Sequence, residues 1–126
     1  MAMNQRTELE SIGEFGLIQK ISEPFRNPAR PETIRGIGDD AAVIDTGGPD
    51  FLLVSTDMLL EGIHFDLAYS PLRHLGYKSV AVNVSDIAAM NGSPTQVTVS
   101  IGISNRFSVE AVEELYAGIR AACDAY

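Results

Sequence analysis

Carboxylate side chains occur in three short segments: 36–40 (GIGDD), where two aspartates are adjacent, and 55–57 (STD) and 83–86 (NVSD), where hydroxyl or amide side chains lie beside them. A buried carboxylate without a partner is costly, and several that converge would repel one another unless a cation neutralised them. Because the candidate ligands are all oxygen atoms, the expected cation is Mg²⁺, Ca²⁺ or Mn²⁺ rather than zinc. Mg²⁺ held by carboxylates commonly binds nucleotide phosphates as well. The three segments therefore predict a divalent-metal site suited to phosphate chemistry.

Each acidic segment also has an ordinary structural interpretation. Asp39 and Asp40 could form a solvated turn, residues 55–57 could cap a helix, and Asp86 could face solvent on a helix. Residues 36–41 also match the Gly-x-Gly-x-x-Gly/Ala pattern of dinucleotide-binding proteins. We reject that match because such a turn follows an apolar strand and opens a helix, whereas PETIR precedes this one. No Gly-x4-Gly-Lys-Ser/Thr sequence occurs, which excludes a P-loop.

The elements that must position these segments are helices and strands in mixed order, which indicates an α/β or α+β fold. Apolar runs predict strands over 41–45, 51–59 and 97–104, and the nearly continuous run from Phe51 favours a strand buried on both faces. Helices are predicted over about 12–22, over 71–90 and from Ser108 onward. Residues 23–35 hold three of the six prolines and are expected to form a loop.

Residues typical of helix ends support the three helices. Ser11 and Glu14 have the spacing of a capping box, and Ser108 is a suitable N-cap for the last helix. Ser70-Pro71 and Asn91-Gly92 are a matching start and stop for the middle helix. These ends favour a helix over a strand for the alternating sequence VAVNV, residues 80–84, between them.

Composition narrows the class of protein. The 126 residues are about one domain's worth, and the 45% hydrophobic and 21% charged residues are typical of a globular protein. A net charge of −8 without a basic run argues against nucleic acid as a partner. The single cysteine, Cys123, permits no intrachain disulfide, and the sequence shows neither a signal peptide nor a membrane span. A cytoplasmic protein is therefore expected.

Five motifs occur together in an order typical of one enzyme family. They are GEF (13–15), GIGDDAA (36–42), STDML (55–59), GIHF (62–65) and AVNVSDIAAM (81–90). The chain resembles the N-terminal domain of the thiamine-monophosphate kinase family. That family belongs to the superfamily of aminoimidazole ribonucleotide synthetase and selenophosphate synthetase. The histidine of GIHF favours the thiamine kinase branch.

The resemblance implies an activity and roles for particular residues. The activity is transfer of the γ-phosphoryl group of ATP to thiamine monophosphate, which gives thiamine diphosphate. Several Mg²⁺ ions would take part, and Asp57 and Asp86 would act at the catalytic centre. The implied metal ligands are Asp40, Ser55, Thr56, Asp57 and Asp86. Asp40 and Asp86 would also hold the metal-bound nucleotide, Tyr116 would contact ATP, and His64 would contact the phosphate substrate.

The resemblance also implies the architecture. It is a two-layer fold with a mixed β-sheet and helices on one face, in which sheets pair across a homodimer. The family has a second, C-terminal domain and a Gly-Gly-Asp motif that these residues lack. Residues 1–126 are therefore expected to be an ATP- and Mg²⁺-binding N-terminal domain, inactive alone. Two alternatives stay open: a sister enzyme with another acceptor, and a non-catalytic module that binds divalent metal or mediates assembly.

Overall fold

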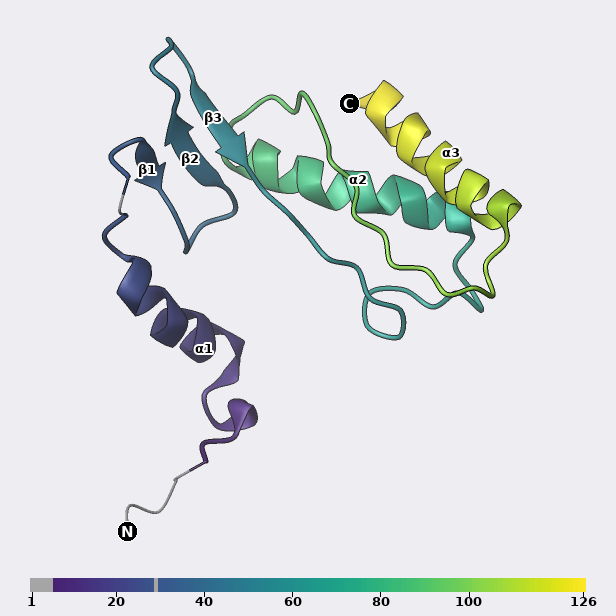
Figure 1. The fold of residues 1–126 in the computed structure, drawn as a ribbon, viewed down its shortest axis with the longest axis horizontal. Coiled ribbons are helices and arrows are strands. Elements are labelled where there is room, and N and C mark those ends of the chain that lie inside the picture. Colours follow the sequence, from purple (N-terminus) through teal and green to yellow (C-terminus); the bar gives the residue numbers. More distant parts are fainter. Residues whose placement is uncertain (1–5, 29) are drawn as a thin grey trace. The chain divides into compact units, whose positions relative to one another are not determined.

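A computed structural model describes residues 6–28 and 30–126. The chain divides into a first unit that ends at Val54 and a second unit from Ser55 to Tyr126. The helices and strands in Figure 1 confirm the expected combination of a sheet with helices. Along the described part of the chain, no helix combines the length and the apolarity needed to cross a membrane.

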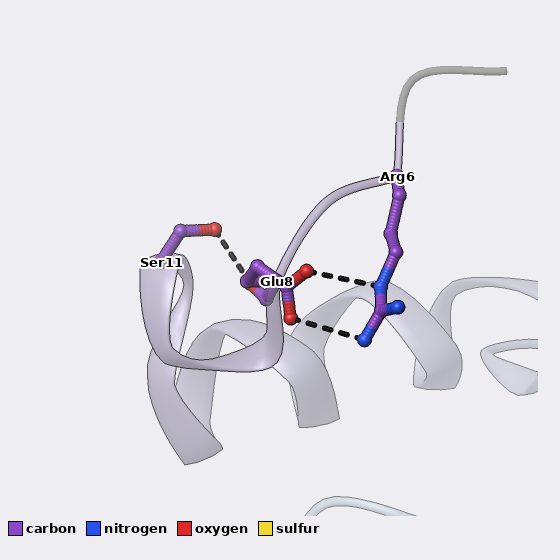
Figure 2. A network of polar contacts seen from close by, with 3 residues as sticks. All are labelled: Arg6, Glu8 and Ser11. Carbon is purple, nitrogen blue, oxygen red and sulfur yellow. Dashed lines mark hydrogen bonds and ion pairs between the residues drawn. The ribbon is translucent and has the colours of Figure 1, made fainter.

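The first unit begins with short helical elements. A 3₁₀ turn, η1 (Leu9–Ser11), precedes α1 (Gly13–Ser22), and η2 (Glu23–Phe25) follows it. The position of α1 confirms the prediction, but the capping box is wrong, because no side chain caps the N-terminus of α1. Figure 2 shows the reason: the hydroxyl group of Ser11 donates a hydrogen bond backward to the carbonyl oxygen of Glu8, at 2.7 Å. Glu8 in turn pairs with Arg6 at 2.9 Å.

A three-stranded sheet follows in the first unit. Strands β1 (Thr33–Arg35), β2 (Ala42–Asp45) and β3 (Phe51–Val54) lie in the order β1-β2-β3 and pair antiparallel. The β2–β3 connection is a tight turn, in which Gly47 adopts a φ of 82° and donates its N–H to the carboxylate of Asp45 at 2.8 Å. The sheet is antiparallel throughout the described residues, where a mixed sheet was expected.

The structure differs from expectation in three segments. The segment 23–35 is not entirely a loop, because β1 lies at its end. Strand β3 stops at Val54 rather than near residue 59, and it is not buried on both faces, since Phe51 is 59% exposed. Residues 97–104 form no strand in the described structure. Apolar and β-branched side chains give a tendency toward a strand, but a paired neighbour is needed to realise it.

The second unit is built on two helices. Helices α2 (Leu72–Ala89) and α3 (Val109–Ala125) pack side by side (Figure 1). Val80, Ile119 and Ala122 are buried between them, and Val84 and Leu115 pack against this cluster. Ile119 and Ala122 thus form the buried face of α3, whereas Cys123, near the end of the helix, is exposed.

Two glycines allow these helices to approach closely. A methyl group at Gly76 would collide with the backbone carbonyl of Leu115 on α3. One at Gly118 would collide with the backbone carbonyl of Arg73 on α2. Each glycine therefore faces the backbone of the opposite helix, and the short distance between the helices depends on the missing side chains.

The ends of α2 and α3 follow the predicted signals with one shift. Pro71, rather than Ser70, is the N-cap of α2, and it makes no side-chain cap. After α2, Asn91 adopts a φ of 56°, and Gly92 donates its N–H to the carbonyl oxygen of Ile87 at 3.0 Å. This is the Schellman arrangement, with asparagine in the left-handed position that glycine usually takes. At α3, Ser108 accepts the N–H of Ala111 at 3.1 Å, as predicted.

Candidate functional site

Two of the three acidic segments meet in the second unit. Ser55, the first residue after β3, donates its hydroxyl to a carboxylate oxygen of Asp86 on α2, at 3.2 Å. Asp57, two residues further on, also lies close enough to Asp86 for the two carboxyl groups to interact. Residues 31 positions apart in the sequence therefore form one cluster of oxygen atoms.

The electrostatics of this cluster favour the arrival of a positive charge. Partial burial raises the pKa of Asp57, and the negative charge of Asp86 together with a hydrogen bond between the two side chains raises it further. The nearby His64 opposes this shift and lowers the pKa of Asp57. Like-charged carboxylates held together in this way gain stability when a cation neutralises them.

Two other polar side chains that precede Asp86 on α2, those of Ser79 and Asn83, bond within the helix. Ser79 donates its hydroxyl to the carbonyl oxygen of Gly76 at 2.7 Å, and Asn83 donates its amide to that of Ser79 at 2.9 Å. Such bonds to carbonyls three or four residues earlier satisfy polar groups on a helix without any ligand. Asp86 differs from them, because its carboxylate points to Ser55 and Asp57 outside the helix.

His64 lies in a tightly hydrogen-bonded turn over residues 60–65. The carbonyl oxygen of Leu60 accepts the N–H groups of Ile63 and His64, at 3.2 and 2.9 Å. The N–H of Leu60 donates to Nδ1 of the His64 ring at 2.8 Å. Gly62, with a φ of 78°, donates its N–H to the carbonyl oxygen of Phe65 at 2.7 Å. The turn thus holds both the backbone and the ring of His64.

A cavity of about 230 Å³ opens beside this turn. His64 and Phe65 line one part of it, and His74 and Lys78 on α2 line another. Lys78 also donates its ammonium group to the carbonyl oxygen of His64 at 2.7 Å, which joins α2 to the turn. The cavity is smaller than the roughly 300–1,000 Å³ of a typical small-molecule site, so it would enclose only part of a larger ligand.

The third acidic segment lies in the first unit, where its two aspartates differ. Asp39 forms an ion pair with Arg35, and one of its carboxylate oxygens accepts the N–H of Asp40 at 2.9 Å. Both interactions lower the pKa of Asp39, and the hydrogen bond from the backbone of Asp40 has the larger effect. Asp40 is exposed, and no hydrogen bond or ion pair of its carboxylate occurs within the described residues. Asp39 thus has a structural role, which leaves Asp40 as the candidate ligand.

The remaining candidate residues are accessible. Thr56 is exposed next to Ser55 and Asp57. Tyr116 on α3 is 41% exposed, so its side chain is accessible to a ligand. The sequence interpretation missed two positively charged side chains. Arg35 pairs with Asp39, and Lys78 bonds to the turn that carries His64. Arg35 stands four residues before Asp39, which was a detectable signal, whereas Lys78 gave none.

The Ser55–Asp57–Asp86 cluster suits a hard divalent cation. Across the described ranges 6–28 and 30–126, no group of three or more His, Cys, Asp or Glu side chains is arranged to hold a metal ion. Mg²⁺, however, is usually bound by one or two carboxylates, and water and phosphate oxygens complete its coordination. Two carboxylates and a hydroxyl group in one cluster therefore fit Mg²⁺ shared with a phosphate ligand.

Comparisons with known proteins agree with this chemistry. Residues 38–126 match the family model for the AIR synthase related protein, N-terminal domain. The thiamine-monophosphate kinase of Aquifex aeolicus is 36% identical over 118 residues, which are 94% of this chain and 36% of the relative. That of Bacillus subtilis is 35% identical over 121 residues, 91% of this chain and 35% of the relative. The chain therefore spans about a third of the length of these curated relatives.

A solved structure is also similar. It is described as AaThiL complexed with AMPPCP and TMP, and it matches 98% of this chain and 37% of its own, with 34% identity and a TM-score of 0.83. The resemblance predicted from the five motifs is thus confirmed. The family model covers well over half of the chain, including the segments of Asp40, Asp57, His64 and Asp86. The chain belongs to the AIR synthase related protein family, of which it contains the N-terminal domain.

Proposed function

We propose that this chain provides the ATP- and Mg²⁺-binding part of a thiamine-monophosphate kinase, which converts ATP and thiamine monophosphate into ADP and thiamine diphosphate. The observation that carries the proposal is the cluster of Asp57 and Asp86 beside His64 in a chain whose curated relatives are thiamine-monophosphate kinases. The similar solved structure binds AMPPCP, an ATP analogue, together with TMP.

The reaction requires little covalent chemistry from the protein. An oxygen of the acceptor phosphate attacks the γ-phosphorus of ATP, and the bond from this phosphorus to the bridging oxygen of ADP breaks. The acceptor oxygen is already anionic, so no general base is needed. Catalysis then depends on holding two highly charged substrates in line and on neutralising their charge.

The residues of the chain divide these tasks. Asp57 and Asp86, with Ser55 and Thr56, would hold Mg²⁺, and Asp40 would also bind Mg²⁺. Bound Mg²⁺ supplies the positive charge that lets the polyphosphate approach this acidic site. His64 would donate a hydrogen bond to the phosphate of thiamine monophosphate, and Tyr116 would contact ATP.

We further propose that the protein is a homodimer. Four apolar side chains of the segment 97–104 are between 41% and 53% exposed: Val97, Val99, Ile101 and Ile103. An alternating apolar segment that pairs with no strand among residues 6–28 and 30–126 is suited to pairing with a second copy. Light scattering coupled to size exclusion tests this, and a monomer at micromolar concentration would contradict it. A cytoplasmic location stays a prediction.

Kinetics of the complete gene product test the proposed function. We expect ADP formation to depend on thiamine monophosphate and thiamine diphosphate to appear in equal amount. The substitution His64→Ala should raise the KM for thiamine monophosphate about 10-fold or more and leave the KM for ATP nearly unchanged. A change of about 10-fold is what the loss of one hydrogen bond to a charged group is expected to cause. Ile63→Ala is the matched control, because Ile63 is 72% exposed in the same turn.

The results separate the alternatives. Turnover of ATP with another acceptor but not with thiamine monophosphate would indicate a sister enzyme. Binding of Mg²⁺ without binding of ATP would indicate a non-catalytic module. An equal rise of both KM values in His64→Ala would contradict the assignment of His64 to the acceptor.

A further inference from the structure

We propose that Lys78 is a positioning residue, which, together with the backbone of Leu60, fixes the ring of His64 so that its Nε2–H alone donates to an anionic ligand. This inference rests on the proposed function for its ligand, a phosphate monoester. Its structural part, the fixed tautomer and the action of Lys78, does not depend on that function.

The first argument concerns the ring itself. The N–H of Leu60 can only donate, and it meets Nδ1 of His64 at 2.8 Å. Nδ1 must therefore accept, so in the neutral ring the proton is on Nε2. An unconstrained histidine would instead exchange between two tautomers, in only one of which Nε2 can donate. Phosphate oxygens are acceptors, so the fixed tautomer is the one that binds them.

The second argument concerns the turn that carries the ring. The carbonyl oxygen of Leu60 accepts the N–H of His64 at 2.9 Å, so Leu60 holds the residue by both its backbone and its ring. A single residue thus sets the direction in which Nε2 points. The turn is short and its side chains are largely exposed, so it needs an external support to keep that direction.

Lys78 provides this support. Lys78 lies on α2, and its ammonium group donates a hydrogen bond to the carbonyl oxygen of His64 at 2.7 Å. Helix α3 packs against α2 and holds it in place. Lys78 and His64 also line the same cavity of about 230 Å³. The lysine therefore connects the rigid part of the unit to the residue proposed to contact the ligand, and it leaves the ring free to face the cavity.

Spectroscopy of the purified, ligand-free protein tests the structural part. Long-range ¹H–¹⁵N correlations of the imidazole ring report which nitrogen carries the proton. In the wild type we expect the Nε2–H form of His64 alone. In Lys78→Met we expect averaged signals from both tautomers, whereas Lys78→Arg should restore the single form. The control is Lys20→Met, which removes the other lysine of the chain, an exposed residue on α1.

Kinetics of the complete gene product test the ligand. Glutamine can place an N–H donor near the position of Nε2, whereas asparagine reaches only the position of Nδ1. His64→Gln should therefore keep the KM for thiamine monophosphate within about 3-fold of wild type, and His64→Asn should raise it about 10-fold or more. Lys78→Met should raise the same KM, with the KM for ATP unchanged and rescue by Lys78→Arg.

Each outcome bears on a distinct part of the inference. Unchanged imidazole signals in Lys78→Met would overturn the positioning role, and a raised KM with unchanged signals would mean that Lys78 contacts the ligand directly. Equal effects of the asparagine and glutamine variants would overturn the Nε2–H donor. If the wild type does not phosphorylate thiamine monophosphate, the proposed function fails, but the spectra still decide the roles of Lys78 and Leu60.

Discussion

The crossing of α2 and α3 offers a direct test of how the second unit holds Asp86 and Lys78 in place. The substitution Gly118→Ala adds one methyl group where the backbone carbonyl of Arg73 already stands. Since backbone cannot rotate away as a side chain does, the two helices must separate. Separation also reduces the packing of the buried side chains between them, such as Val80.

The magnitude follows from two opposing effects. Overpacking a well-filled contact costs about 1–3 kcal/mol. Replacing glycine by alanine inside a helix contributes about 0.5–1 kcal/mol in the opposite direction. The two ranges combine to a net cost of about 0–2.5 kcal/mol, and since the collision is with backbone, we expect Gly118→Ala to lower the free energy of unfolding by about 1–2 kcal/mol within that range. For a chain of 126 residues, each kcal/mol corresponds to a fall of the Tm by roughly 3–6 °C.

Thermal and urea unfolding followed by far-UV circular dichroism measure this effect. The matched control is Gly102→Ala, since a methyl group at Gly102 meets nothing within 4 Å. Gly76→Ala should resemble Gly118→Ala, because it meets the carbonyl of Leu115 from the other helix. A Gly118→Ala protein as stable as the control, or more stable, would refute the close crossing.

The other predictions concern the acidic residues. Because the pKa of Asp57 is raised, its negative charge destabilises the metal-free protein at pH values above the ordinary pKa of 3.8. Asp57→Asn should therefore keep or raise the Tm measured in EDTA, but it should abolish the increase in Tm that Mg²⁺ causes in the wild type. Glu61→Gln is the control. Asp86→Asn should abolish kinase activity of the complete gene product and leave its circular dichroism unchanged, so unchanged turnover at saturating Mg²⁺ would contradict its role. The lowered pKa of Asp39 means that the interactions of its carboxylate stabilise the fold above pH 3.8. This stabilisation is lost as the pH falls through the lower pKa that Asp39 has in the folded protein. Arg35→Ala should raise this pKa toward 3.8 in an NMR titration.

Local signals were enough to predict the helices. The positions of α1, α2 and α3 agree with the expected ranges within a few residues, because spacing of apolar residues and end signals such as Ser108 act within one segment. The strands were less predictable. Whether residues 97–104 form a strand depends on a partner elsewhere, and the segment of β1 was obscured by the prolines before it.

The candidate site was predictable by residue type and less so by contact. The motifs identified Ser55, Asp57 and Asp86, and the structure brings these three together. They did not identify Lys78, whose bond is to a backbone carbonyl oxygen. Any residue can supply that acceptor, so no pattern of side chains could have revealed the contact.

The cluster of Asp57 and Asp86 is also where the chain departs from rules that its other segments obey. Asp86 lies in the last turn of α2, where the negative end of the helix disfavours a carboxylate by about 0.3–1 kcal/mol. Asp57 stands beside it, although their charges repel. Selection for stability alone would remove both features, since asparagine keeps the shape without the charge. A cation shared with phosphate turns the same two charges into a favourable interaction, so the local cost is itself an argument that the cluster binds a ligand.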